Sequence, residues 1–349
     1  MRALRDTALN PLLAFVLCAA GGALCSTVQT PLPWIIGPLL VMALFNFRGA
    51  GLRAPPGTRN LGQIVIGTAL GLYFTPTVAR ELASYWILLL VAALLAIAIG
   101  VLCAMFLCRV ARIDLTTAFF ASVPGGAAEM AVLAERHGGR VDRVAIAQSL
   151  RILVVVSVIP FGLTYSGVHG TDVYLPATTV VDWGRLALLL GIAAGCGGLL
   201  AALGAPNAYM LGPLFAVIGL TVAESSFSAM PAVVSNIGQL FIGCALGARF
   251  ERRFVQGVPR FLIGVLASLV LALVLAAAAA LLLAWGYGLP VPSLILATAP
   301  GGIAEMCITA KVLQLGVPLV TAAHVTRVIV LVTGTGPCTG SRSVGGLRE

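Results

Sequence analysis

The sequence predicts an all-α polytopic membrane protein made of two homologous inverted repeats. The 349 residues are 60% hydrophobic and 9% charged, whereas a soluble domain carries about 25% charged residues. The mean hydropathy is +1.06. The segment 124–130, Pro-Gly-Gly-Ala-Ala-Glu-Met, returns 176 residues later at 300–306 as Pro-Gly-Gly-Ile-Ala-Glu-Met. Such duplication of an apolar chain is typical of transporters and channels.

Both halves contain the same elements in the same order. Each begins with an opening helix and a helix with a central Gly-Pro pair. A glycine-rich segment, a long apolar helix, the Pro-Gly-Gly segment and a helix with one arginine follow. The opening helices span about 9–28 and 185–203, and the long helices span 84–108 and 261–284. The N-terminus could also be a signal peptide, but its match with 185–203 favours a retained first helix.

The positions of the arginines separate two topologies. If six elements of each half cross the membrane, the halves are parallel and Arg136, Arg140 and Arg143 lie outside. If the Pro-Gly-Gly segment re-enters, or one other element fails to span, each half crosses five times and the second half is inverted. Most arginine-bearing loops are then cytoplasmic, as the positive-inside rule requires. We therefore expect about 10 transmembrane crossings plus two broken or re-entrant Pro-Gly-Gly segments.

This topology divides the chain into four parts. The first membrane repeat covers 1–168, an external linker covers 169–184, the second membrane repeat covers 185–336, and a polar C-terminal tail covers 337–349. The tail limits the last helix to about 317–335. The N-terminus is expected in the cytoplasm of a bacterial cell, with the chain crossing the inner membrane several times.

The Pro-Gly-Gly segments are the first candidate site. Proline followed by two glycines breaks a helix, and broken backbone at membrane depth is tolerated where it faces protein or a water-filled cavity. One interpretation is a kink whose glutamate caps its own helix end. The other is a paired substrate or ion site, with one half-helix from each repeat. Its candidate residues are Ser122, Gly125, Gly126 and Glu129, matched by Thr298, Gly301, Gly302 and Glu305.

Arg151 and Arg327 lie inside apolar stretches. A charge at the bilayer centre costs at least about 2.5–3.5 kcal/mol on insertion scales, so such a residue needs a partner. Ion pairs of Glu129 with Arg151 and of Glu305 with Arg327, or the crossed pairs, are the simplest explanation. These pairs could be structural, or one member could release the other to bind a proton or a substrate.

The glycine-rich segments carry four amides, Asn60, Gln63, Asn236 and Gln239. They stand beside Gly67-x-x-x-Gly71 and Gly243-x-x-x-Gly247. Small residues at this spacing let helices pack closely in lipid, and we expect that role for the glycines. The amides are candidates for lining a polar cavity.

Other functional classes find little support in the sequence. The three histidines lack metal-site spacing, the eight cysteines contain no Cys-x-x-Cys pair, and no nucleotide loop or cofactor fingerprint is present. The net charge of +9 comes from arginines between apolar runs, with no segment long enough for a DNA-binding unit. We expect no enzymatic activity, no cofactor, no metal and no direct nucleic-acid binding. The expected partners are the lipid bilayer, an unknown small solute or ion, and further copies of the chain in a homo-oligomer.

The twin Pro-Gly-Gly-x-Ala-Glu-Met segments, the Asn-x-Gly-Gln segments and the trailing arginine helices resemble the AbrB-type membrane duplication family of Gram-negative bacteria. The resemblance covers about residues 10–337. Members of that family carry labels such as regulator of gene expression and ammonia monooxygenase. The architecture is also similar to that of cation/proton antiporters and anion transporters with inverted repeats. Three scattered histidines do not supply the copper or iron site of a monooxygenase.

Two functions therefore stay open at the level of the sequence. The first is a secondary transporter with a proton- or ion-linked site at the repeat interface, where Glu129 and Glu305 bind the ion. Arg151 and Arg327 would then be counter-ions or would hold an anionic substrate. The second is a non-transporting membrane sensor that affects gene expression indirectly, through a partner.

Overall fold

The computed structural model describes residues 2–168, 170, 174–225, 227–250 and 259–335, where the chain forms fifteen α-helices and no strand. The all-α prediction is confirmed for these ranges, and the tail 337–349 lies outside them. The helices are α1 (Arg2–Thr27), α2 (Pro33–Phe47), α3 (Thr58–Gly71), α4 (Pro76–Ser84), α5 (Trp86–Ala111), α6 (Leu115–Ser122), α7 (Ala127–Arg136), α8 (Val141–Tyr165), α9 (Trp183–Ala202), α10 (Ala208–Val222), α11 (Ala232–Gly247), α12 (Pro259–Tyr287), α13 (Val291–Thr298), α14 (Ile303–Leu313) and α15 (Val317–Thr335).

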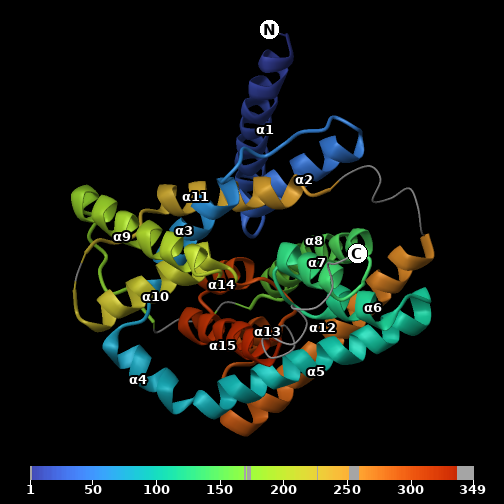
Figure 1. Cartoon of the computed structure of the whole chain (residues 1–349). Helices are drawn as coiled ribbons and strands as arrows, with labels where there is room; N and C mark the ends of the chain where they lie inside the picture. The colour runs from blue at the N-terminus through green and yellow to red at the C-terminus, as the bar shows by residue number, and fades with distance from the viewer. Residues whose placement is uncertain (1, 169, 171–173, 226, 251–258, 336–349) are drawn as a thin grey trace, which may run out of the picture.

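The helices form two groups, which Figure 1 shows one above the other. The first helix group contains α1, α2, α3, α9, α10 and α11, and the second contains α5–α8 and α12–α15. Each group draws helices from both halves of the chain. Helix α14 of the second group packs against α3 of the first, so the duplicated Pro-Gly-Gly region lies near the junction of the two groups.

Packing in the first helix group depends on glycines at matching positions. Helix α1 packs on α2 where Gly21 meets Gly37, and α9 packs on α10 where Gly197 meets Gly212. A Cβ atom added at Gly212 would lie 2.6 Å from the Cα of Gly197. These contacts bring backbones together, as small residues do in membrane helices.

The predicted packing role of the small-x-x-x-small glycines is confirmed. A Cβ atom at Gly67 of α3 would lie 2.6 Å from the backbone oxygen of Met210 on α10, and one at Gly243 of α11 would lie 2.5 Å from that of Ile35 on α2. Gly71 and Gly247 make equally close approaches to α10 and α2. Thus α2 packs against α11, and α3 packs against α10, each contact joining one half of the chain to the other.

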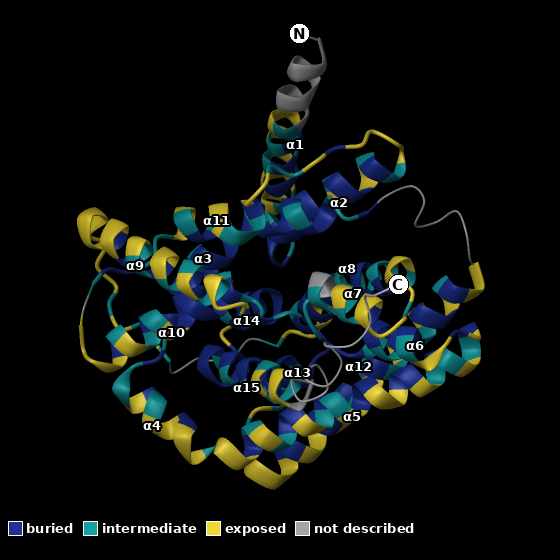
Figure 2. Ribbon diagram, in the orientation of Figure 1, coloured by how far each residue is buried: buried dark blue, intermediate teal, exposed yellow. Residues whose placement is uncertain are grey.

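Large apolar side chains cover the outside of the helix bundle. Figure 2 shows exposed residues along the outer faces of α5, α9 and α12, among them Leu282 (67% exposed) and Trp285 (90% exposed). Four of the described helices, α5, α8, α9 and α12, are long and apolar enough to cross a membrane. These features are compatible with a membrane protein.

The short helices differ from the simplest sequence prediction. Helices α2, α10 and α11 are apolar but have only 15 or 16 residues, or about 22–24 Å of helix. Helix α4 was not predicted from the sequence. It leaves α3 with a bend of 88°, so α3 and α4 together make a fifth candidate span. Proline at its first position and the Thr75 side chain, which accepts from the Val78 N–H, start α4 separately.

Candidate functional site at the two helix breaks

The predicted helix breaks are present in both halves. Helix α6 ends at Ser122 and α7 starts at Ala127, while α13 ends at Thr298 and α14 starts at Ile303. The Pro-Gly-Gly sequence fills each gap, since proline cannot donate to the helix and glycine accepts extended backbone. Each break exposes the C-terminus of one half-helix and the N-terminus of the next.

The second glycine of each motif makes room for the glutamate. A Cβ atom at Gly126 would lie 2.6 Å from Oε2 of Glu129, and one at Gly302 would collide with Oε2 of Glu305. The glutamate is the third residue of its half-helix, so its carboxylate folds back over the N-terminus. There it meets the positive end of the helix dipole.

The first glycine of each motif lies under the methionine that ends the motif. A Cβ atom at Gly125 would lie 2.6 Å from Cε of Met130, and one at Gly301 would lie 2.6 Å from Cγ of Met306. The pattern Pro-Gly-Gly-x-Ala-Glu-Met is therefore a packing unit, in which each glycine is paired with a later side chain of the same motif.

Arg151 of α8 binds the first break through the backbone. Its Nη1 donates to the oxygen of Val123 at 3.2 Å, and its Nη2 donates to the oxygen of Gly125 at 3.1 Å. The side chain is almost fully buried, with 3% exposed. The guanidinium thus meets the carbonyl end of α6, which carries the negative end of that helix dipole.

Arg327 of α15 repeats this arrangement in the second half. Its Nη1 donates to the oxygen of Ala299 at 2.9 Å, and its Nη2 donates to the oxygen of Gly301 at 2.7 Å. It is also 3% exposed. All four contacts keep the offset of 176 residues, so the duplication extends from the sequence to individual hydrogen bonds.

One turn before each arginine, a second polar side chain reaches the same half-helix. Nε2 of Gln148 donates to the oxygens of Phe120 at 2.7 Å and Val123 at 3.1 Å. At the matching position, Nε2 of His324 lies 2.9 Å from the oxygen of Leu296. Gln148 and His324 are fully buried. These contacts join α8 to α6 and α15 to α13.

The predicted glutamate–arginine ion pairs are wrong. The ion pairs within 4.0 Å in the described ranges are Arg140–Asp142 and Arg185–Asp182, both at exposed positions. Backbone carbonyls take the place of the glutamates as partners of the buried arginines. Each break is instead balanced by two opposite charges, an arginine at the C-terminus of one half-helix and a glutamate at the N-terminus of the next.

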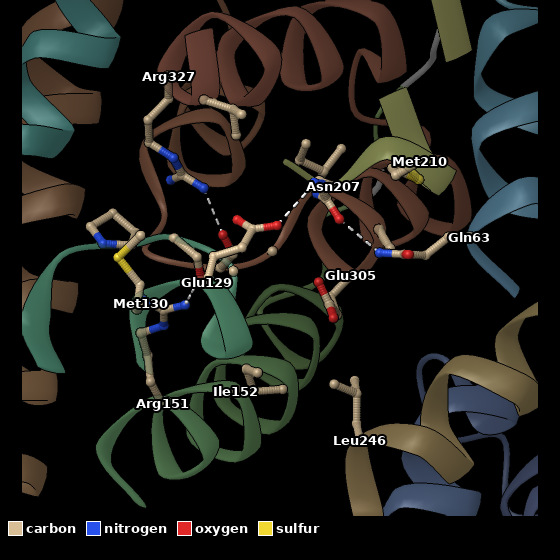
Figure 3. A pocket seen from close by; sticks show the side chains of 18 of the residues that line it. Gln63, Glu129, Met130, Arg151, Ile152, Asn207, Met210, Leu246, Glu305 and Arg327 are labelled. Atoms are coloured by element: carbon tan, nitrogen blue, oxygen red, sulfur yellow. Dashed lines mark hydrogen bonds between the residues drawn. The ribbon is translucent and has the colours of Figure 1, made fainter. Parts of the chain in front are cut away.

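Both breaks open onto one cavity of about 90 Å³ (Figure 3), enough for several water molecules. Helices α3, α7, α8, α10, α11, α14 and α15 all contribute to its wall. Of the residues predicted from the sequence, those that line it are Gln63, Gly125, Gly126, Glu129, Arg151, Gly301, Gly302, Glu305 and Arg327. The two copies of the motif, far apart in sequence, therefore form a single site.

Glu129 connects the two helix groups. Its Oε1 accepts the backbone N–H of Asn207 at 2.9 Å. The Asn207 side chain in turn accepts from Nε2 of Gln63 at 2.8 Å. Figure 3 shows this chain of hydrogen bonds from α7, through the start of α10, to α3. Glu129 of the second helix group is thus held by the backbone of Asn207, whose side chain is held by Gln63.

Glu305 lies on the same cavity but is bound differently. It is 7% exposed, and in the described part of the chain its carboxylate accepts no hydrogen bond. The hydroxyl of Thr309 donates to its backbone oxygen instead, at 2.7 Å. Figure 3 shows the carboxylate facing the space beside Ile152 and Leu246.

Ser122 and Thr298 lie behind the cavity rather than on it. Together with Pro124 and Pro300 they line a second, much smaller cavity of about 10 Å³ between the two breaks. The Thr298 hydroxyl donates to backbone oxygens, including that of Ala276 at 3.0 Å. The Ser122 hydroxyl is buried and has no protein partner among the described residues. Neither residue lines the larger cavity.

Three of the four predicted amides lie away from the cavity. Asn60, Asn236 and Gln239 are not among its lining residues. Nε2 of Gln239 points to Oδ1 of Asn236 at 3.5 Å, which is a long contact within α11. Only Gln63 was correctly predicted as a lining amide.

Two polar residues that line the cavity, Arg59 and Asn207, were not predicted from the sequence. Arg59 immediately precedes Asn60 and is one of a group of loop arginines. Asn207 has φ 53° and ψ 32°, a left-handed conformation that asparagine tolerates. Asn207 is not a repeated polar residue, because the matching residue of the first half is Leu32. Leu32 has the same φ of 53°.

The model of a family described as "Transition state regulatory protein AbrB" matches residues 34–340. The chain belongs to the AbrB family. The predicted resemblance is therefore confirmed across most of the chain.

Two relatives of this AbrB-family chain match it over nearly the full length of both proteins. "Uncharacterized protein YhjN" of Bacillus subtilis (strain 168) is 30% identical, and the match covers 94% of this chain and 91% of the relative. "Putative regulator AbrB" of Escherichia coli (strain K12) is 26% identical, with 88% and 89% covered.

Proposed function

We propose that this AbrB-family protein is a secondary transporter of the bacterial inner membrane, with its ion- or proton-linked site at the two helix breaks. The observation that carries the proposal is the cavity itself. Glu129 and Glu305 from opposite halves, with the arginines that bind the two breaks, line one cavity inside an apolar bundle. Binding sites between discontinuous helices of two repeats are the common design of secondary transporters.

The proposed topology has two inverted repeats of five crossings each, with the N-terminus in the cytoplasm. Helices α6–α7 and α13–α14 are re-entrant pairs in this topology, entering from opposite sides. Aromatic residues support it, because Trp86, Trp183 and Trp285 lie at helix ends that would all be external. They are 61%, 67% and 90% exposed, as expected of side chains at a membrane interface.

The same topology gives the cavity a direction. Arg59 and Asn207 lie at the starts of α3 and α10, and Leu246 lies at the end of α11. These three helix ends are cytoplasmic in the proposed arrangement. The cavity would thus be reached from the cytoplasm, and transport would require a second state that opens to the other side.

A non-transporting sensor is the second candidate, and the name "Putative regulator AbrB" of the Escherichia coli relative favours it. A sensor would bind a solute in the same cavity and pass the signal to a partner protein, without contacting nucleic acid itself. Neither candidate includes an enzymatic step or a cofactor. Homo-oligomer formation is compatible with both.

Flux measurements in proteoliposomes separate the two candidates. Ion and solute gradients of several kinds would be applied to the wild type and to a Glu129→Gln/Glu305→Gln double variant. Flux that disappears in the double variant supports transport at this site. The matched control is Glu135→Gln, which removes an exposed carboxylate from the same helix α7 and should leave flux unchanged. Absence of wild-type flux under every gradient would favour the sensor.

A further inference from the structure

The duplicated carboxylates at the two breaks have different surroundings. Glu129 accepts a backbone hydrogen bond from Asn207 at 2.9 Å. Glu305 lines the same cavity and is only 7% exposed. Within the described ranges its carboxylate accepts no hydrogen bond. A buried carboxylate without a hydrogen-bond donor is costly in its charged form.

The difference arises outside the motif. The residue of the first half that matches Asn207 is Leu32, which begins α2 with the same left-handed φ of 53°. Leu32 is 1% exposed, and no hydrogen bond joins it to Glu305 in the described structure. The two halves thus offer one glutamate a donor and leave the other without one.

We propose that Glu305, and not Glu129, is the proton-binding carboxylate of this protein, while Glu129 ties the second helix group to the first. The inference deepens the proposed function and rests on it for the identity of the cavity as the transport site. It assigns unequal tasks to two residues that the sequence presents as equivalent.

A proton fits this site better than a metal cation. A metal cation needs several oxygen ligands at once, and four of the backbone oxygens at the breaks are those of Val123, Gly125, Ala299 and Gly301. All four already accept guanidinium hydrogens. A proton needs only one carboxylate oxygen.

Charged groups surround Glu305 on several elements. Its charge acts on Arg151 of α8 and on Arg249, which follows α11. Arg59, Glu129 and Arg327 line the same cavity. The cavity is thus lined by three arginines and two glutamates, and protonation of Glu305 leaves its net charge more positive. The proton-loaded cavity therefore favours a small anion as the accompanying solute.

The direct test is infrared difference spectroscopy of the full chain in lipid nanodiscs, between neutral and acidic pH. The wild type should gain the C=O band of a protonated, buried carboxyl group. Glu305→Gln should lose this band and Glu129→Gln should keep it. The control Glu135→Gln should change only the signal of solvated carboxylates. A band that persists in Glu305→Gln, or disappears in Glu129→Gln, overturns the proposal.

A second pair of variants covers the case in which Glu305→Gln fails to fold. Glu305→Asp keeps a carboxyl group but shifts its C=O frequency, whereas Glu129→Asp should leave the band where it is. A shift in Glu129→Asp alone would overturn the proposal.

Salt exchange distinguishes a proton from a metal cation. At neutral pH, the melting temperature should be the same in sodium chloride and choline chloride at equal concentration. Stabilisation by sodium that is lost in Glu305→Gln would overturn the proton assignment. The spectroscopic test does not need flux. A band lost in Glu305→Gln without wild-type flux would uphold the proton site and reject transport. Wild-type flux without that band would uphold transport and reject the proton site.

Discussion

Arg151 and Arg327 make the same two contacts in the two halves of the chain. Each donates Nη1 to the carbonyl before the proline of a broken helix and Nη2 to the carbonyl after it. The polar backbone freed by the break is thereby satisfied within the protein. Each buried guanidinium thus supplies the hydrogen-bond donors for two backbone carbonyls of a broken helix.

Replacing Arg327 by glutamine should therefore unfold the second break. The change removes two charge-assisted hydrogen bonds, worth about 1.5–3 kcal/mol each, and leaves buried carbonyls unpaired. We expect a loss of roughly 3–5 kcal/mol in the free energy of unfolding, measured by thermal unfolding in detergent. Arg140→Gln, which removes an exposed ion pair, should cost at most about 1 kcal/mol. Equal effects of the two changes would contradict the assigned role.

Alanine at Gly302 should disturb the site without replacing a charged residue. The new Cβ would collide with the Glu305 carboxylate, and such overpacking costs about 1–3 kcal/mol. Gly219→Ala in α10 is the matched control, because no atom lies within 4 Å of the added Cβ. It should be neutral or stabilise the helix by up to about 1 kcal/mol. Melting temperatures of both variants check the difference.

Valine at Gly62 should separate the two halves within the first helix group. A Cβ at this position would lie 2.6 Å from the backbone oxygen of Gly238, where α3 crosses α11. We expect a loss of about 1–3 kcal/mol and a lower yield of monodisperse protein in size-exclusion chromatography. Gly191→Val on α9, with open space around it, should keep a wild-type elution profile. A normal profile for Gly62→Val would rule out this crossing.

Asn207 should tolerate glycine better than alanine. Both substitutions remove the side chain that accepts from Gln63, but the backbone N–H that binds Glu129 is kept. Alanine must also adopt φ 53°, which destabilises by more than the gain from a stiffer unfolded chain. Alanine should therefore melt below glycine, and glycine below wild type. The reverse order would show that the left-handed conformation is unimportant.

Much of the site could be predicted from the sequence because the duplication marked it. The two breaks, the glycines that let helices approach, and the meeting of Glu129 with Glu305 on one cavity were all visible as repeated residues. The partners of the arginines were not, because a sequence lists charged side chains and does not reveal which carbonyls a break leaves free. Repetition also gave a wrong prediction. Asn236 and Gln239 repeat Asn60 and Gln63, but only Gln63 lines the cavity.

The number of crossings is harder to predict for a physical reason. Helices α2, α10 and α11 are shorter than the roughly 20 residues of a typical membrane span, and their apolar composition does not show how deep in the membrane they lie. Helix α4 was not expected for a similar reason. Thr75 and Pro76 start this helix after the 88° bend that follows α3, and hydropathy does not reveal such a bend. Hydropathy identifies long spans and leaves short ones unassigned.

The location of the arginine contacts has a consequence for how such a chain could arise and assemble. Arg151 binds the break of its own half, and Arg327 does the same in its half. The contacts of α2 with α11 and of α3 with α10, by contrast, are made only between halves. A single ancestral half would have carried a complete, charge-balanced break but no partner for its glycine faces. Two such halves could dimerise before their genes fused, and halves synthesised separately today should still find each other through those faces.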